Sequence, residues 1–500
     1  MPAQPSSLQN LSMLSYLTTA KYLNGIHCLK RLWYEEKHPE KASPLSLSQQ
    51  RLSDQRKTLK TLAYSRFPEG VYIAAEDPDV AVRHTETAIN RGESCLFNAA
   101  FLLNGVFVRC DLLQKDGKGW RIIEIRASKK IKKEYLLNLA LQKYILDTCD
   151  IPICATQLML LDETCVYPDL SNLFVCVDVT DKVNVLKQEV SGYLRTLKTT
   201  LYRDSEPNVL IGKNLCNRPH RCPFKTSCWT LVPKNSVFNI PKIKDPEATA
   251  LAENGIFRLS DLPTDFPLTP SQSIYVNSVL ENKPAIDRVA IRQELANLQY
   301  PIHFLDFETD RPAIPRFEGF KVYEEFPFQY SCHILQSDGA VTYHEYLHTD
   351  ISDPRLPFLQ SLLAHISDRG SIVVYNLSFE RRILRNLAES FPEYASALQS
   401  IIERLWDQLT VLRKHYEHPG FCGSKSLKSV LPVLVPSLSY KTLDIQEGGD
   451  APAVWNLMLS ASNETERQEW HQRLRAYCKL DTLAMVEIHK VLQEKSTYPT

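Results

Sequence analysis

The chain has 500 residues, 44% of them hydrophobic and 23% charged, which is too long for one hydrophobic core and predicts two or three domains. Its 58 basic and 58 acidic residues cancel, which excludes a polycation and confines any nucleic-acid surface to a local patch. No apolar run reaches the ~18 residues of a membrane-spanning helix, and the N-terminus lacks a secretory signal pattern. We therefore expect a cytoplasmic protein with no membrane partner.

The first half of the chain alternates helical and strand patterns. Residues 14–37 have the apolar spacing of a helix that runs into Cys28, and residues 95–126 form three strand-like runs that predict a β-meander. Residues 134–147 have helical spacing, and two strands follow within residues 154–179. A long helix is then predicted from about residue 182 to residue 202.

Beyond residue 236 the pattern changes twice. Short helices punctuated by proline predict a helical connector, and strand patterns begin again at residue 301. Strands followed by strands alternating with helices predict a mixed α/β domain. We therefore expect a multidomain α/β protein with domains at residues 1–235, 236–300 and 301–500.

Asp306 and Glu308 lie in the strand-like run LDFET, where alternate side chains point to the same face. Adjacent carboxylates repel each other unless a cation lies between them. Mg²⁺ prefers oxygen ligands and keeps positions open for a substrate phosphate. The pair predicts a site for Mg²⁺ or Mn²⁺, and a solvated acidic pair is the alternative.

Two further motifs follow in the chain. Glu380 lies in the first turn of a helix after the strand VVYN, and Tyr477 and Asp481 are four residues apart on one helix face. The alternative for Glu380, taken by itself, is an acid stabilised by the helix dipole. The alternative for Tyr477 and Asp481 is a surface pair. The three motifs in this order favour a single site.

That order resembles the DnaQ-like exonucleases of the RNase H-like superfamily, in the subtype with a catalytic tyrosine. The resemblance implies an RNase H-like fold and removal of nucleotides in the 3′→5′ direction by two-metal hydrolysis. Glu380 stands where that family usually has aspartate, and Asp407 is expected to be structural. The implied metal ligands are Asp306, Glu308, Glu380 and Asp481, with Tyr477 orienting the attacking water.

Three cysteines, Cys216, Cys222 and Cys228, are spaced C-x5-C-x5-C, wider than the usual zinc pattern. Cys28, near the other end of the domain, is the candidate for a fourth ligand. One distant cysteine followed by a triplet resembles the RecB-like nucleases closed by a [4Fe-4S] cluster, among them the CRISPR-associated exonucleases. Four thiolates suit such a cluster.

The same resemblance implies a PD-(D/E)XK, restriction-endonuclease-like fold. Asp111, Glu124 and Gln142 match the motif of that fold, whereas Arg126 stands in place of its lysine and Asn98 in place of its upstream acid. Arginine does not deprotonate and has a different geometry. We therefore expect a degenerate nuclease that retains nucleic-acid binding, and ordinary strand and helix polar residues are the alternative.

Basic residues gather in RASKKIKK and in residues 207–244, which contain no acidic residue. Trp33, Tyr34, Phe224 and Trp229 are predicted to stack on bases. The segment GSKSLK at residue 423 offers either phosphate donors or a helix start capped by Ser424 or Ser426. The predicted nucleic-acid contacts are Lys129, Lys130, Lys132, Lys133, Arg218, Arg221, Lys225, Ser424 and Lys428.

Over nearly its whole length the chain resembles an uncharacterised bacterial family that fuses a RecB-like iron–sulfur domain to a DnaQ-like exonuclease domain. We expect a metal-dependent exonuclease acting on single-stranded DNA or RNA. The alternatives are a dual nuclease, in which Asp111 and Glu124 also cut, and a non-catalytic nucleic-acid-binding adaptor.

Overall fold

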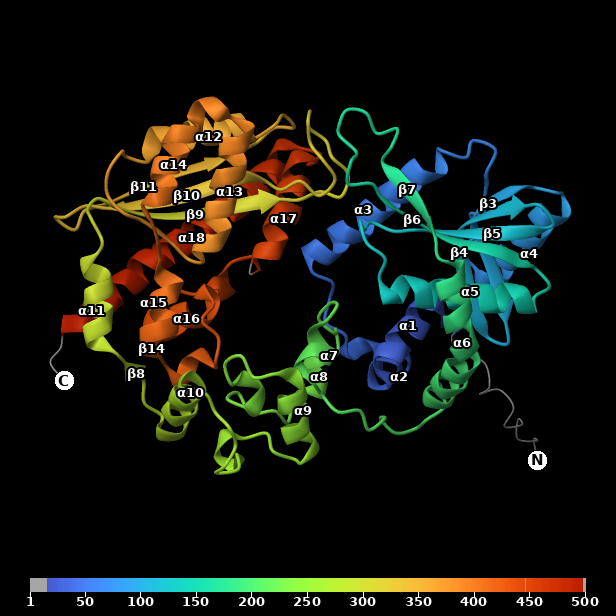
Figure 1. Ribbon diagram of the computed structural model, residues 1–500, viewed down its shortest axis with the longest axis horizontal. Coiled ribbons are helices and arrows are strands. Elements are labelled where there is room, and N and C mark those ends of the chain that lie inside the picture. Colours follow the sequence, from blue (N-terminus) through green and yellow to red (C-terminus); the bar gives the residue numbers. More distant parts are fainter. Residues whose placement is uncertain (1–15, 446, 498–500) are drawn as a thin grey trace, which may run out of the picture. The chain divides into compact units, whose positions relative to one another are not determined.

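The computed structural model describes residues 16–445 and 447–497, which form two compact units (Figure 1). Unit 1 contains residues 16–45, 52–230 and 313–322, and unit 2 contains residues 46–51, 231–312, 323–445 and 447–497. The multidomain mixed α/β architecture is therefore confirmed, with residues 236–300 grouped in unit 2. No helix in the described ranges is both long and apolar enough to cross a bilayer.

Unit 1 is built on a seven-stranded sheet with the strand order β2-β3-β4-β5-β6-β7, in which β1 pairs with β4. The predicted meander is confirmed as β3 (Cys95–Leu103), β4 (Val106–Asp116) and β5 (Gly119–Ile125), paired antiparallel. Helix α5 (Lys133–Thr148) then crosses over to β6 (Ile153–Leu161), which lies parallel to β5. Such a crossover is the usual connection between parallel strands.

Helices α1, α4, α5 and α6 contribute apolar side chains to one core with these strands, and Leu139, Leu141 and Ile145 of α5 are fully buried in it. The remaining elements of unit 1 are β1 (Leu17–Thr18), α1 (Thr19–His27), α2 (Leu29–Lys37), η1 (Pro39–Lys41), β2 (Val71–Tyr72), α4 (Pro78–Asn90), β7 (Phe174–Asp178), α6 (Thr180–Leu201), α7 (Lys213–Asn217) and α8 (Lys225–Cys228). Helix α3 (Leu47–Tyr64) begins with residues of unit 2 and continues into unit 1.

The prediction of one helix over residues 14–37 is wrong, because the helix is interrupted at Cys28. Residues 14 and 15 lie outside the described ranges. Cys28 has an extended backbone, with φ −157° and ψ 113°, between α1 and α2. Apolar periodicity continues across the break, so the sequence pattern alone does not reveal it. The break leaves Cys28 at the junction of two helices.

Unit 2 is built on a five-stranded sheet with the order β11-β10-β9-β12-β13. The four predicted strands are confirmed as β9 (Ile302–Asp310), β10 (Phe326–Leu335), β11 (Val341–Leu347) and β12 (Ile372–Val374). The fifth strand, β13 (Leu405–Asp407), was not predicted, because three residues between helices carry no periodic signal. Strand β10 pairs antiparallel with β9 and β11, whereas β12 pairs parallel with β9 and β13.

Both faces of this sheet are covered (Figure 1). On one face Leu305 and Phe307 of β9 pack with α12 (Arg355–His365), α13 (Leu377–Ser390) and α14 (Ala395–Glu403). On the other face Phe304 packs against Met485 and Val486 of the long helix α18 (Glu464–Thr497). Strand β9 is thus central, and its two acidic side chains lie on the α18 side.

The other elements of unit 2 are η2 (Val237–Asn239), α9 (Asp245–Glu253), η3 (Leu259–Asp261), α10 (Pro270–Glu281), β8 (Ala285–Ile286), α11 (Arg288–Ala296), η4 (Pro392–Tyr394), α15 (Gln408–His415), β14 (Tyr416–Glu417), η5 (Pro419–Phe421), α16 (Leu427–Leu434), η6 (Tyr440–Thr442), η7 (Gly448–Asp450) and α17 (Ala451–Leu459). Strand β8, within the predicted connector, pairs with β14. This pairing joins the connector to the rest of unit 2.

Candidate functional site

Three carboxylates meet where β9 and α18 pack together. One side-chain oxygen from each of Asp306, Glu308 and Asp481 lies within 4.8 Å of the other two. Glu308 and Asp481 are only 8% and 6% exposed, and Asp306 is partly buried. Strand alternation places Asp306 and Glu308 on one face, and α18 supplies Asp481 from above that face.

Hydrogen bonds from β10 fix α18 over the pair. Ser331 pairs with Asp306 across the strands, and its hydroxyl donates to the carbonyl of Cys478 at 2.6 Å. The amide of Gln329, opposite Glu308, donates to the carbonyl of Leu474 at 3.0 Å. These bonds hold the helix segment that carries Tyr477 and Asp481 against the strands.

Burial raises the pKa of all three acids, and repulsion by neighbouring carboxylates adds to the shift for Asp306 and Glu308. Burial and then the charges of Asp481 and Glu308 raise the pKa of Asp306 well above its ordinary value. Burial and the charge of Asp481 do the same to the pKa of Glu308. Burial raises the pKa of Asp481 to about 6, against the hydrogen bonds of Tyr440 and Tyr477 and the charge of Lys428. A divalent cation with oxygen ligands would relieve this repulsion.

Glu380 lies close to the triad but outside it. It sits in the first turn of α13, is 1% exposed, and its Oε2 has no hydrogen-bond partner among the described residues. Burial raises the pKa of Glu380 to about 8, and the charge of Glu380 contributes to the raised pKa of Asp306. Asp407 instead caps α15 and accepts the backbone N–H of Asn376 at 3.1 Å, the structural role expected for it.

Two tyrosines flank Asp481. Tyr477, on α18, is 3% exposed, and Tyr440, in η6, is 6% exposed. The Tyr440 hydroxyl donates to Oδ1 of Asp481 at 2.5 Å. The ammonium of Lys428 lies 5.4 Å from the Tyr440 ring centre and 5.1 Å from that of Tyr477. Sequence reasoning missed Tyr440, which lies in an irregular segment with no motif to mark it.

Part of this region matches a known family model. Residues 303–426 match a domain of unknown function, DUF2779. The matched segment includes Asp306, Glu308 and Glu380 and ends before Tyr477 and Asp481. No curated protein matches the chain.

In unit 1, the four predicted cysteine ligands line one cavity. Cys28 comes from the junction of α1 and α2, Cys216 from α7, Cys228 from α8, and Cys222 from the loop between them. The thiols are close enough that Cys28, Cys216 and Cys222 each contribute to the raised pKa of Cys228, after burial as the main cause. Two ends of unit 1 therefore meet at these sulfur atoms.

Three of the four aromatic residues predicted to stack on bases are instead buried against two of these cysteines. Trp33, Tyr34 and Phe224 are 6%, 5% and 1% exposed and form an apolar cluster with Cys222 and Cys228. The prediction that these three side chains stack on nucleic acid is therefore wrong. These aromatic residues alternate with basic residues in the sequence, as in a nucleic-acid-binding surface. In the structure they are buried because they pack against Cys222 and Cys228.

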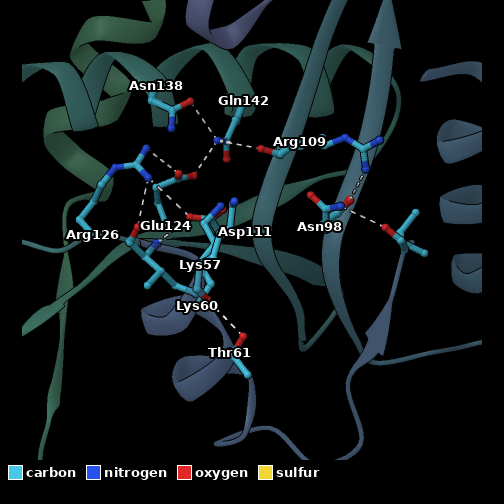
Figure 2. Close-up of polar contacts among 12 residues, drawn as sticks. Lys57, Lys60, Thr61, Asn98, Arg109, Asp111, Glu124, Arg126, Asn138 and Gln142 are labelled. Carbon is cyan, nitrogen blue, oxygen red and sulfur yellow. Dashed lines mark hydrogen bonds and ion pairs between the residues drawn. The ribbon is translucent and has the colours of Figure 1, made fainter. Parts of the chain in front are cut away.

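A second polar cluster lies at the predicted degenerate nuclease site (Figure 2). Asp111 on β4 and Glu124 on β5 are 6% and 3% exposed. Arg126 lies 2.6 Å from Glu124 and 3.6 Å from Asp111, and the Gln142 amide donates to Glu124 at 2.7 Å. Asn98 is turned away, and its amide donates to the Ile73 carbonyl at 3.0 Å.

Lys60 of α3 also belongs to this cluster, and sequence reasoning missed it. Its ammonium forms an ion pair with Oδ1 of Asp111. Burial raises the pKa of Asp111, but the charges of Lys60 and Arg126 outweigh burial and hold this pKa below its ordinary value. Burial raises the pKa of Glu124 to about 7. No motif marks Lys60, because α3 lies far from β4 in the sequence and carries several basic residues.

The predicted nucleic-acid contacts are distributed over both units. Lys129, Lys130, Lys132 and Lys133 are exposed, and Lys129 and Lys132 lie 3.6 and 4.0 Å from Glu163 and Glu134. Arg218 and Arg221 are exposed, whereas Lys225 lies 4.6 Å from the centre of the Trp229 ring. Ser426 caps α16, and the Ser424 hydroxyl donates to Ser426 at 3.2 Å, which is the helix-start alternative.

Proposed function

We propose that the chain is a metal-dependent phosphodiester hydrolase, a 3′→5′ exonuclease acting on single-stranded DNA or RNA at the triad of unit 2. The observation that carries this proposal is the approach of Asp306, Glu308 and Asp481 to within 4.8 Å, largely buried and beside Tyr477. Bound cations stabilise a group of buried carboxylates with raised pKa values, whereas apolar packing does not.

The fold supports this assignment. The central strand β9 lies between β10, which is antiparallel to it, and β12, which is parallel to it, and helices cover both faces of the sheet. At the edges, β11 pairs antiparallel with β10 and β13 pairs parallel with β12. This arrangement agrees with the expected RNase H-like fold. It places the acids of β9 next to the first turn of α13 and to α18, as the resemblance to DnaQ-like exonucleases requires.

The side chains of the site have distinct roles in this proposal. Asp306, Glu308 and Asp481 would hold Mg²⁺ or Mn²⁺, and Glu380 would act at the edge of the same site. The bound ions would supply the charge that stabilises in-line displacement at phosphorus. Tyr440 donates a hydrogen bond to Oδ1 of Asp481 and would orient this carboxylate. Tyr477 borders the triad and would orient the attacking water.

Unit 1 would bind the nucleic acid and be closed by a [4Fe-4S] cluster. The cavity lined by Cys28, Cys216, Cys222 and Cys228 fits this group, since four cysteines converge on one apolar space. When bound, the cluster would link the α1–α2 junction covalently to α7 and α8. The exposed lysines after β5 would contact phosphates, whose binding is electrostatic and sequence-independent.

The test uses the full chain with end-labelled single-stranded DNA and RNA, with Mn²⁺ or EDTA. The wild type should shorten one substrate from its 3′ end in Mn²⁺ alone, and Asp306→Ala should reduce the rate at least ~100-fold. Glu389→Ala, which removes an exposed acid of α13, is the matched control and should cut like the wild type. Equal cleavage by Asp306→Ala and the wild type would exclude the triad as the cleaving site, and no cleavage by either would leave the adaptor hypothesis.

Glu380→Asp examines the departure from the family pattern. Aspartate restores the usual residue, so activity should persist or rise if Glu380 supports the metal centre. Glu380→Gln removes the charge and should lower the rate. If Glu380→Gln cuts as fast as the wild type, Glu380 has no part in the site.

A further inference from the structure

We propose that Lys428 is a further catalytic residue at the triad of unit 2. Its ammonium contacts a non-bridging oxygen of the scissile phosphate and supplies the positive charge that a second ion supplies in two-metal hydrolysis. The triad then works with one divalent ion. This inference rests on the function proposed for the triad and deepens it, because it names the number of ions and the side chain that takes the place of the second one.

Helix α16 carries Lys428 to the triad. Leu427, the residue before it, packs on the apolar cluster that includes Met485 of α18. Val430 is fully buried in a neighbouring cluster that α18 also joins. These contacts fix the first turn of α16 against the helix that carries Asp481.

The ammonium of Lys428 lies beside the two tyrosines that flank Asp481. It is 5.4 Å from the ring centre of Tyr440 and 5.1 Å from that of Tyr477, distances at which an ammonium is attracted to an aromatic face. Its charge also acts on the carboxylates, since it opposes the rise that burial causes in the pKa of Glu308 and of Asp481. Lys428 therefore belongs to the same cluster as the triad.

The local structure does not account for a lysine at this position. Lys428 lies in the first turn of α16, where the positive end of the helix dipole disfavours a cation. The neighbouring Lys425 has a structural role instead, because it forms an ion pair with Glu417 at 2.7 Å and donates to the carbonyl of Tyr416 at 2.9 Å. Residues that conflict with their local structure are concentrated at functional sites.

The acidic side chains around the triad provide ligands for one ion. No second group of three acids lies as close together within residues 16–445 and 447–497, and Glu380 is outside the triad. Both oxygens of Asp407 are already bonded, one to the backbone N–H of Asn376 at 3.1 Å and the other to the hydroxyl of Thr410 at 2.7 Å. Three carboxylates with one divalent ion keep one negative charge, which the ammonium of Lys428 balances.

In the reaction, a bond forms between a water oxygen and phosphorus, and the bond from phosphorus to the 3′ oxygen of the preceding nucleotide breaks. The water releases one proton to solvent, and the leaving oxygen takes up one proton. Hydrolysis therefore needs no oxidant or other co-reactant. Negative charge increases on the non-bridging oxygens in the transition state, and the ammonium of Lys428 stabilises this charge.

The first part of the experiment separates catalysis from binding in the full chain. With saturating end-labelled single-stranded DNA or RNA in Mn²⁺, Lys428→Met should lower the single-turnover rate ~100-fold. Its affinity for the strand, measured by filter binding in EDTA, should fall less than ~10-fold, because the other phosphate contacts remain. A lysine that only binds the strand would instead weaken affinity and leave the rate at saturation unchanged.

The second part counts ions by titration calorimetry with Mn²⁺ alone. The wild type should bind one more Mn²⁺ than Asp306→Ala. Lys428→Met should bind this ion several-fold more tightly, because an ammonium no longer repels it. Lys428→Arg keeps the charge, so it should keep the wild-type affinity for Mn²⁺ and cut within ~10-fold of the wild-type rate. Lys441→Met, at an exposed lysine next to Tyr440, is the matched control and should change neither quantity.

The two proposals fail separately. A wild type that does not cut refutes the proposed function and the role of Lys428 with it, whereas cleavage that Asp306→Ala abolishes supports the function and leaves Lys428 to be judged alone. The role of Lys428 is then overturned if Lys428→Met cuts like the wild type, if Lys428→Met loses Mn²⁺ binding rather than tightening it, or if Asp306→Ala removes two ions.

Discussion

Asp481→Asn should stabilise the protein without metal and remove its stabilisation by metal. Burial raises the pKa of Asp481 from 3.8 to about 6, so the native state holds this proton more tightly than the unfolded state. Stability from this group is complete below pH 3.8 and is lost as the pH rises through about 6. Asparagine keeps an acceptor for Tyr440 and carries no charge.

The magnitude follows from the pKa shift that burial causes, and charge repulsion within the triad is of similar size. A shift of about two pKa units at 1.36 kcal/mol each gives ~3 kcal/mol for ionising Asp481 in the native state. Two charges 4.8 Å apart at an effective dielectric constant of 20 repel by ~3.5 kcal/mol. In EDTA at pH 8 the variant should therefore exceed the wild type by up to ~3 kcal/mol in free energy of unfolding, and the difference should close near pH 4.

Urea unfolding at pH 8 and pH 4.5 measures the difference in free energy of unfolding between Asp481→Asn and the wild type. In Mn²⁺ this difference should change sign. A metal at 100 times its dissociation constant stabilises the wild type by ~2.7 kcal/mol, whereas the variant lacks one ligand. Glu389→Gln, an exposed acid of α13, should behave like the wild type throughout. Equal stability of Asp481→Asn and the wild type in EDTA at pH 8 would refute the argument that the ionised Asp481 destabilises the protein without metal.

Three further predictions concern other parts of the molecule. Tyr440→Phe removes the hydrogen bond to Asp481, which is worth ~1.5–3 kcal/mol with a charged acceptor, and should lower kcat at least ~10-fold without changing nucleic-acid affinity. Single-turnover kinetics measures the rate and filter binding measures the affinity. An unchanged kcat would exclude a positioning role for Tyr440. Cys28→Ser should eliminate iron and sulfide and lower the thermal unfolding temperature, whereas Cys154→Ser, at an exposed thiol, should not; iron retained in Cys28→Ser would contradict the ligand set. The last prediction replaces four exposed lysines by alanine: Lys129, Lys130, Lys132 and Lys133. The slope of log affinity against log salt for single-strand binding should decrease in magnitude by roughly 0.7 for each lost phosphate contact. An unchanged slope would show that these lysines do not contact phosphates.

Elements with long periodic patterns could be predicted from the sequence. The meander of β3–β5, helix α5 and the strands β9–β12 lie where their apolar runs indicated. Short elements could not, because β13 has three residues and the helix break at Cys28 leaves the apolar spacing intact. Pairing in the sheet and packing on neighbouring helices decide such segments, and both are long-range effects.

The candidate sites divide in the same way. Asp306 and Glu308 share one strand face, and Tyr477 and Asp481 share one helix face, so local geometry was enough to group them into pairs. Lys60 and Tyr440 carry no local motif, because each reaches its carboxylate only through tertiary packing. Asn98 shows the converse, since its position in the motif was aligned but its side chain bonds the Ile73 carbonyl instead.

Unit 1 is discontinuous in sequence, and this affects how the chain folds during its synthesis. Residues 313–322 belong to unit 1, where Phe320 is 1% exposed and its carbonyl accepts the N–H of Tyr167 at 2.9 Å. A ribosome adding ~5–20 residues per second reaches this segment roughly 5–20 s after residue 230. During that interval the surface that receives Phe320 stays uncovered in the nascent chain, so we expect chaperones to bind there before the segment arrives.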